Sequence, residues 1–278
     1  MNKGFCTVVT EDWLDIAKNL IDSVMTFSEY DIAVTCINFD HDFGNDRVIS
    51  KRKDITKPTY FNICRIKPFA CLNSPFDTTL LLDGDMIVLP NIDNIFDDQK
   101  HVEETEYPLC AQHPHDPSHK FRKSLSSCGT EKTPRMKWVY ANYIFTKKHD
   151  WFFYRILDIM EKYAHLDRIP GGTMGEEAAV NAVLADVEAD TNMGYNYFPM
   201  GLPPMIDYYF DNNDEAGTKY LNDTYLLHPS NGCDKVVFYA FHAHLIKDAS
   251  YTASLLARIK WEKKIDTLTV QATTKKTG

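Results

Sequence analysis

The chain has 278 residues, 44% of them hydrophobic, and a formal net charge of −9. This length suits one large domain or two small ones, and the apolar content excludes an intrinsically disordered chain. The acidic balance argues against nucleic acid or an anionic membrane as the main partner, because both select basic surfaces. No apolar run approaches the roughly 20 residues that span a bilayer, so we expect no integral membrane segment.

Seven cysteines are scattered along the chain, an odd number without any CxxC pair. This usage is typical of a reducing compartment, where cysteine serves as a small hydrophobic residue. The N-terminal stretch MNKGFCTVVTEDW has acidic residues directly after a short apolar core, so it does not read as a signal peptide. We therefore expect a soluble, cytoplasmic protein.

The first third of the chain alternates apolar strands with helices. Three continuous apolar runs predict buried strands, at 4–10, 31–40 and 78–89. Apolar residues recur at helical spacing over 11–27, and residues 60–72 also predict a helix. The charged stretch 40–58 reads as a loop or lid. Continuous apolar strands separated by helices indicate a parallel sheet that is covered on both faces.

The remainder of the chain is mixed in character. A short helix after Pro90 and an apolar segment at 107–112 lead into a long irregular region, 113–136. A strand, two amphipathic helices, a late strand and a last helix are then predicted, at 137–147, 149–165, 171–187, 235–248 and 250–264. No repeat or linker divides the chain, so we expect one domain over 1–265 and a flexible tail over 266–278.

Two aspartates interrupt the third apolar run, in the stretch LLLDGDMIVLP. Asp83 and Asp85 would share one strand face, and a chain break at Gly84 would leave both at the sheet edge where ligands bind. Two neighbouring carboxylates need a cation or a shared proton, and such oxygen ligands suit Mg²⁺ or Mn²⁺ completed by substrate phosphates. The alternative is a surface bulge with solvated aspartates, which the apolar frame disfavours.

An Asp-x-Asp at a strand end occurs in two enzyme classes. Phosphatases of the haloacid-dehalogenase type use the first Asp as a nucleophile, close after the first strand and usually with Thr or Val where this chain has Ile87. The other class is the nucleotide-sugar glycosyltransferases. LLLDGDMIVLPNIDNIF resembles the segment vLYLDaDvlv..dl.eLf of GT-A-fold glycosyltransferase family 8, the glycogenin and bacterial galactosyltransferase group. The resemblance implies that Asp83 and Asp85 hold Mn²⁺, with Mg²⁺ as the other candidate, against the donor diphosphate.

Further segments resemble the same family in the same order. VYANYIFTKK is similar to fNaGvmlin without its glycine, GEEAAVN to DQdvlN, and YNYFP to the following yN segment. This implies contacts of Asn142 and the adjacent Tyr143 with the sugars, although aromatic residues of this kind are more often core. FHAHLIKD resembles the C-terminal HfxGxxKPW, which implies a third metal ligand at His242 or His244, the former favoured, and a phosphate contact at Lys247. A core or edge histidine is the alternative.

The resemblance assigns the nucleotide site to the end of the first strand and to residues near the aspartates. These positions are Val9, Thr10, Glu11, Arg65, Lys67 and Gly84. A helix cap at Thr10 and ordinary exposed cations at Arg65 and Lys67 are the alternative interpretations. Glu176 and Glu177 take the places of the family's Asp and Gln, as catalytic carboxylates or simply as acids at a helix N-terminus.

Together these features predict a single α/β domain with a GT-A (Rossmann-like) fold, in which helices flank a mixed, mostly parallel central sheet. The nucleotide-binding part would span about 1–112 and the acceptor-binding part about 113–250. The implied enzyme is a metal-dependent hexosyltransferase that moves a sugar from a UDP-sugar to a glycan or protein hydroxyl, with retention. The alternatives are a phosphohydrolase with an Asp nucleophile and an inactive sugar-binding GT-A domain. A sugar nucleotidyltransferase would need a glycine-rich loop, which VVTEDWLD lacks.

Overall fold

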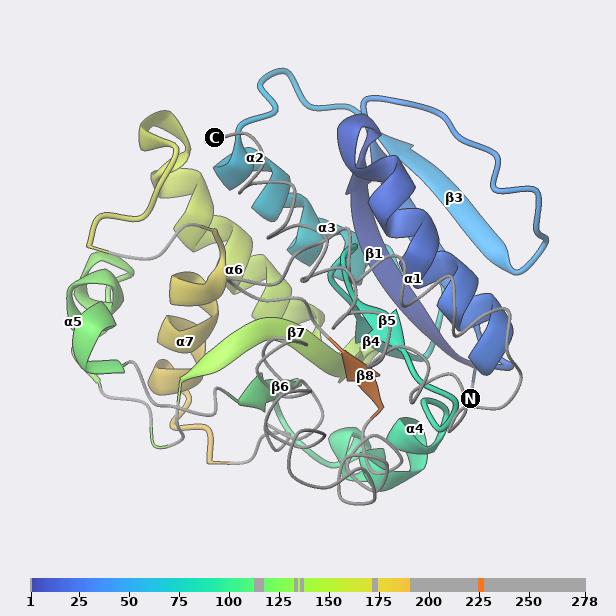
Figure 1. The fold of residues 1–278 in the computed structure, drawn as a ribbon. Coiled ribbons are helices and arrows are strands. Elements are labelled where there is room, and N and C mark those ends of the chain that lie inside the picture. Colours follow the sequence, from blue (N-terminus) through green and yellow to red (C-terminus); the bar gives the residue numbers. More distant parts are fainter. Residues whose placement is uncertain are drawn as a thin grey trace, which may run out of the picture.

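A six-stranded sheet forms the centre of the computed structural model, which describes residues 2–112, 118–132, 135, 138–171, 175–190 and 225–227. Its order is β3-β2-β1-β4-β7-β6 (Figure 1). The strands are β1 (Lys3–Thr10), β2 (Asp31–Ile37), β3 (Val48–Lys53), β4 (Thr78–Leu81), β6 (Leu109–Gln112) and β7 (Val139–Thr146). The first four are parallel, and β7 pairs antiparallel with both β4 and β6. The sheet is therefore mixed and mostly parallel.

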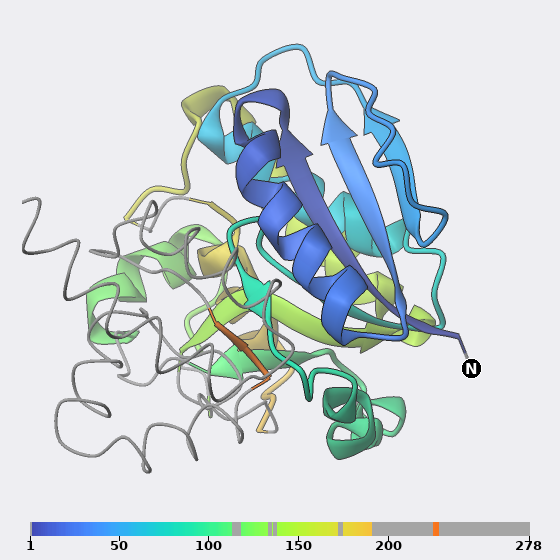
Figure 2. The same ribbon diagram turned by 45° about the vertical axis from the view of Figure 1, so that its right-hand side comes forward.

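Helices cover both faces of this sheet (Figure 1, Figure 2). One face carries α1 (Leu14–Phe27), and the other carries α2 (Tyr60–Cys64), α3 (Ile66–Leu72), α6 (Asp150–Lys162) and α7 (Glu177–Asp186). Each face has its own hydrophobic core. Of two neighbouring residues on β1, Phe5 packs in the core between the sheet and α1, and Cys6 packs in the core on the opposite face. A strand that is buried on both faces has a continuous apolar sequence, which explains the run at 4–10.

Shorter elements complete the described part of the chain. They are η1 (Glu11–Trp13), β5 (Ile87–Val88), α4 (Asn94–Asp98), η2 (Lys100–Glu103), α5 (Ser118–Ser127), η3 (Lys147–His149), η4 (Ala164–Leu166) and β8 (Leu226–Leu227). Strand β5 forms a second, two-stranded antiparallel sheet with β8. The buried Ser23 hydroxyl on α1 accepts a hydrogen bond from the Val88 amide at 3.1 Å, which attaches β5 to that helix.

Three sequence predictions outside the aspartate run are wrong. Residues 48–53, expected in a loop or lid, form β3, an edge strand whose exposed middle residues hide its character from apolar periodicity. The helix expected over 60–72 is divided at Arg65. Pro68 has no N–H to donate to the Cys64 carbonyl, so it is tolerated only in the first turn of a new helix. The irregular region 113–136 contains α5.

The apolar run 78–89 does not form one strand. Strand β4 ends at Leu81, and the chain turns before it resumes as β5 in the second sheet. Of the two possibilities at the aspartates, the chain break is correct and the straight strand is wrong. The strand and helix predicted at 235–248 and 250–264 and the tail at 266–278 lie outside the described residues. In the described part of the chain, no helix is long and apolar enough to cross a membrane.

Candidate active site

The two aspartates lie where the chain order of the sheet reverses. From β1 the chain continues on one side to β2 and β3, and β4 lies on the other side. In open α/β sheets ligands bind outside the carboxyl ends of the strands at such a switch point. A cavity of about 290 Å³ opens there, and its lining includes Val9 and Thr10 from the end of β1 and Asp83, Gly84 and Asp85 after β4.

A tight turn presents the aspartates to this cavity. The Leu82 amide still donates to the Cys6 carbonyl of β1 at 2.9 Å, so the chain leaves the sheet only after that residue. The Met86 amide then donates to the Asp83 carbonyl at 3.0 Å and closes the turn. Gly84 is not among the glycines with a positive φ, and an added Cβ would come no closer than 3.5 Å to the Val8 carbonyl oxygen. The turn therefore does not need glycine for its backbone conformation.

Lys67 connects the aspartate turn to α7. Its ammonium group forms ion pairs with Asp83 and, at 2.9 Å, with Glu176, whose side chain is only 4% exposed. Burial alone lowers the pKa of Lys67, but the two carboxylates raise that pKa well above its ordinary value. Lys67 therefore remains charged and already supplies the cation that buried carboxylates require.

The two glutamates have different positions. Glu176 is buried at the N-terminal end of α7 and joins Lys67 and Asp83. Glu177 is the first residue of α7, is half-buried and raises the pKa of Tyr140 together with the burial of that phenol. The structure thus brings Glu176, but not Glu177, to the aspartate turn.

Of the three predicted nucleotide-binding residues at the end of β1, two line the cavity and one does not. Val9 is 2% exposed and lines the cavity with Thr10. Thr10 occupies the N-cap position of η1, but its side chain makes no capping hydrogen bond. Glu11 is exposed in the first turn of η1 and does not line the cavity.

Other predicted site residues lie elsewhere. Arg65 forms an ion pair with Glu161 of α6 and lines a different cavity. Asn142 and Tyr143 are 2% and 0% exposed on β7, and neither lines the 290 Å³ cavity. The Tyr143 ring packs in the core between α6 and the sheet, with its centroid 5.5 Å from that of Phe153, and burial raises the pKa of its phenol.

A divalent cation fits the aspartate turn by donor chemistry. Asp83 and Asp85 line one cavity and could supply oxygen ligands there, because Mg²⁺ or Mn²⁺ typically takes one or two carboxylates and completes its shell with water and phosphate. Within the described residues, no three His, Cys, Asp or Glu side chains come together as a metal site. His242, His244 and Lys247, the other predicted ligands of metal and phosphate, lie outside the described residues.

Six residues that line the cavity were not predicted as site residues from the sequence: Val8, Trp13, Ala17, Tyr60, Ile63 and Cys64. Trp13 and Tyr60 are 41% and 60% exposed, and both line the cavity with Cys64. Their positions in the sequence could have indicated Trp13 and Tyr60, because Trp13 closely follows β1 and Tyr60 begins α2, which precedes the aspartates. Cys64 is buried, and burial together with nearby Glu176 raises the pKa of its thiol, so it is a protonated, unreactive wall residue.

Comparisons with known proteins support the fold alone. No protein-family model matches the chain, and no curated protein matches it in sequence. Among solved structures, the crystal structure of the galactosyltransferase LgtC in complex with donor and acceptor sugar analogs is similar, with a TM-score of 0.53 and 11% identity. The match covers 82% of this chain and 87% of that one. The predicted α/β fold of the GT-A (Rossmann-like) type, with a mixed, mostly parallel sheet between helices, is thereby confirmed.

Proposed function

We propose that this protein is a glycosyltransferase that moves a sugar from a nucleotide diphosphate sugar, UDP-sugar favoured, to a hydroxyl group of a glycan or protein. One observation carries the proposal: Asp83, Asp85 and Lys67 line one cavity at the switch point of a GT-A sheet. The described residues that line this cavity all lie within the first 112, the part that the sequence assigns to the nucleotide. LgtC, a galactosyltransferase of similar fold, was crystallised with donor and acceptor sugar analogs.

The donor diphosphate would meet both signs of charge in this cavity. Asp83 and Asp85 would hold Mn²⁺ or Mg²⁺, and a bound divalent ion would supply Lewis-acid neutralisation of the leaving diphosphate. Lys67 would contribute a second positive charge from the protein itself, held in place by Glu176. Since Glu176 is engaged by Lys67, we assign it to positioning that cation. Transfer with retention, as in family 8, would leave proton removal from the acceptor to a donor phosphate oxygen.

The experiment that tests this function is a donor panel. UDP-, GDP- and TDP-sugars are incubated with the protein and Mn²⁺, and nucleotide release is monitored. We expect release that depends on Mn²⁺ and is lost in Asp85→Asn, whereas Asp158→Asn, on the exposed face of α6, behaves as the wild type. No release and no thermal shift with any nucleotide and Mn²⁺ would reject the glycosyltransferase proposal. Full metal-dependent activity of Asp85→Asn would reject only its metal role.

The same material separates the two alternative functions. A phosphohydrolase would cleave simple phosphate esters and accumulate an aspartyl phosphate at Asp83, which intact-mass measurement detects. An inactive sugar-binding domain would show a thermal shift with nucleotide and Mn²⁺ but no turnover with any donor.

A further inference from the structure

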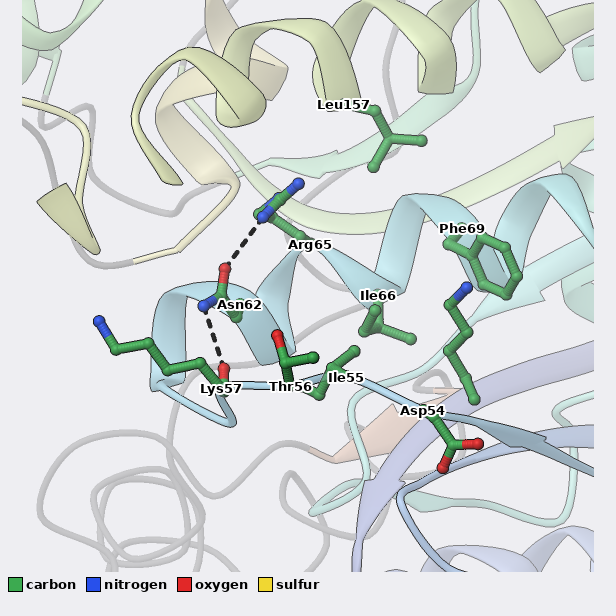
Figure 3. Close-up of a pocket in the computed structure, with 10 residues that line it drawn as sticks. Asp54, Ile55, Thr56, Lys57, Asn62, Arg65, Ile66, Phe69 and Leu157 are labelled. Atoms are coloured by element: carbon green, nitrogen blue, oxygen red, sulfur yellow. Dashed lines mark hydrogen bonds between the residues drawn. The ribbon is translucent and has the colours of Figure 1, made fainter. Parts of the chain in front are cut away.

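A second cavity lies on the other side of α2 and α3. Its volume is about 410 Å³, within the range of small-molecule sites, and its walls come from the end of β3, the following loop, α2, α3 and α6 (Figure 3). Arg65, Ile66 and Phe69 line this cavity, whereas Cys64 and Lys67 of the same helices line the aspartate cavity. The two cavities share no lining residue, so this one is separate from the candidate active site.

The floor and far wall of this cavity are apolar. Ile66 and Phe69 form one side. In Figure 3, Leu157 extends from α6 toward the segment that contains Arg65 and Ile66. Ile55 adds a further half-buried apolar side chain from the loop after β3. A ligand that fills this space needs an apolar body, because a fully polar one would lose its hydration without compensation.

Positive charge is in excess around that floor. The Lys53 ammonium lies 4.2 Å from the centroid of the Phe69 ring, and no carboxylate among the described residues forms an ion pair with it. The single acid of the lining, Asp54, is paired with Arg52 at 2.7 Å. Lys57, in contrast, is already neutralised by Asp167 at 2.7 Å.

Arg65 has hydrogen-bonding capacity left over. Its guanidinium pairs with Glu161 and donates to the Asn62 side-chain oxygen at 3.0 Å, but its buried Nε has no acceptor in the part of the chain that the structure describes. An unsatisfied buried donor is costly, so a rotation of the Arg65 side chain that turns Nε toward a ligand oxygen in the cavity would relieve that cost. Burial lowers the pKa of Arg65, which agrees with incomplete compensation of its charge.

We propose that this cavity binds a small organic phosphate, with the anionic group held by Lys53 and Arg65 and the apolar body packed against Ile66 and Leu157. Phosphate suits the pair better than carboxylate, because its terminal oxygens can accept from the Lys53 ammonium and from the Arg65 guanidinium at once. Glu161 already compensates the charge of Arg65, so Lys53 supplies the net positive charge of the site. The site does not depend on the proposed function, because it lies apart from the aspartate turn.

Phenyl phosphate is a suitable probe for calorimetric titration, with phenol, inorganic phosphate and benzoate as comparisons. We expect phenyl phosphate to bind at least about tenfold more tightly than each of these three, since each lacks the ring, the charge or the second negative charge. Equal affinity for phenol would reject anion recognition, equal affinity for inorganic phosphate would reject the apolar subsite, and equal affinity for benzoate would reject the preference for phosphate.

Variants locate the binding. The double variant Lys53→Gln, Arg65→Gln should lose about tenfold or more in phenyl phosphate affinity. Lys51→Gln, a neighbouring cation on β3 that does not line the cavity, should bind as the wild type. Lys67→Gln, checked for folding by circular dichroism, should also retain binding, and loss of binding there would show that the probe occupies the aspartate cavity and would overturn the proposal. Unchanged affinity in the double variant would overturn it as well.

Discussion

At the scale of single residues, Lys67 compensates the charge of two carboxylates, the buried Glu176 and the half-buried Asp83. It lies between Asp83 and Glu176, and all three side chains are 20% exposed or less. Lys67→Met should lower the free energy of unfolding by about 2–4 kcal/mol, because it leaves both carboxylates without their cation. Urea denaturation measures this, with Lys57→Met as the control. That substitution breaks the more exposed pair with Asp167 and should cost clearly less. Equal losses in the two variants would contradict the assigned role of Lys67.

Gly84 permits a test that separates folding from binding. Its backbone does not require glycine, and an added Cβ would meet only ordinary van der Waals neighbours, at 3.5 Å or more. Gly84→Ala should therefore change stability by less than about 1 kcal/mol. The new methyl group would lie beside Val8 and Ala17, which line the cavity with the aspartates, so we expect weaker thermal stabilisation by UDP and Mn²⁺. A variant that unfolds easily would show instead that the turn needs glycine.

Sequence reasoning identified the residues of the aspartate turn better than their partners. An acid pair within an apolar run is visible locally, whereas the pairing of Lys67 with Glu176 depends on how α3 and α7 pack. Helix geometry nevertheless contained one unused clue. Residues two apart on a helix do not share a face, so helix geometry conflicts with the prediction that Arg65 and Lys67 both reach the nucleotide. The structure places them in different cavities.

At the scale of elements, Asn181 fixes α7 to β7. Its buried amide accepts from the Val139 amide at 3.0 Å and donates to the carbonyls of Val139 and Glu177, each at 2.9 Å. Asn181→Ala should cost about 3 kcal/mol of unfolding free energy, because the Val139 groups lose their partner inside the protein. The matched control is Asn73→Ala, whose exposed side chain donates to the Phe69 carbonyl at 2.8 Å, and which should cost less than about 1 kcal/mol. Similar costs in chemical denaturation would contradict this anchor.

His149 connects β7 to the segment before β6 and makes stability depend on pH. Its Nδ1 accepts from the Thr146 amide at 3.1 Å, so Nε2 carries the proton and faces the Thr105 carbonyl at 3.0 Å. Burial lowers the pKa of His149 to about 4. As pH falls, the unfolded chain binds a proton at this histidine at a higher pH than the folded protein does. The contribution of neutral His149 to the free energy of unfolding is therefore complete above about pH 6.5, and about 3 kcal/mol of it is lost as pH falls toward 4.

His149→Asn should remove this part of the acid sensitivity, since an asparagine oxygen can still accept from Thr146 but does not titrate. Unfolding free energies at pH 7 and pH 4.5 measure the difference, with the exposed His165→Asn as the control. If the two variants lose the same stability between these pH values, His149 does not carry the effect.

At the scale of the whole molecule, the part of the fold visible in the sequence was the part buried on both faces. Strands β1 and β2 show continuous apolar runs because helices cover them on both sides. Strand β3 escaped prediction because it ends the sheet and exposes its middle residues. The antiparallel placement of β7 beside β4 was equally invisible, because periodicity reports burial and not direction.

An open sheet must also protect its edges. Strand β3 lies at the edge of the sheet (Figure 2), where it pairs with β2 on one side and with no described strand on the other. Its middle residues Lys51 and Arg52 are exposed. Charged side chains on an edge strand oppose pairing with a second molecule. Replacing both residues with valine should therefore promote aggregation, even though the net charge becomes more negative and general repulsion increases.

Light scattering during heating measures this effect. We expect Lys51→Val, Arg52→Val to aggregate at a lower temperature than the wild type, with little change in Tm by circular dichroism. The control pair Lys123→Val, Arg155→Val alters net charge equally but lies exposed on α5 and α6, away from a sheet edge. Because the two pairs match in charge and added apolar area, an earlier onset confined to the β3 variant would assign the protection to the edge. An equal shift in both would assign it to surface hydrophobicity alone.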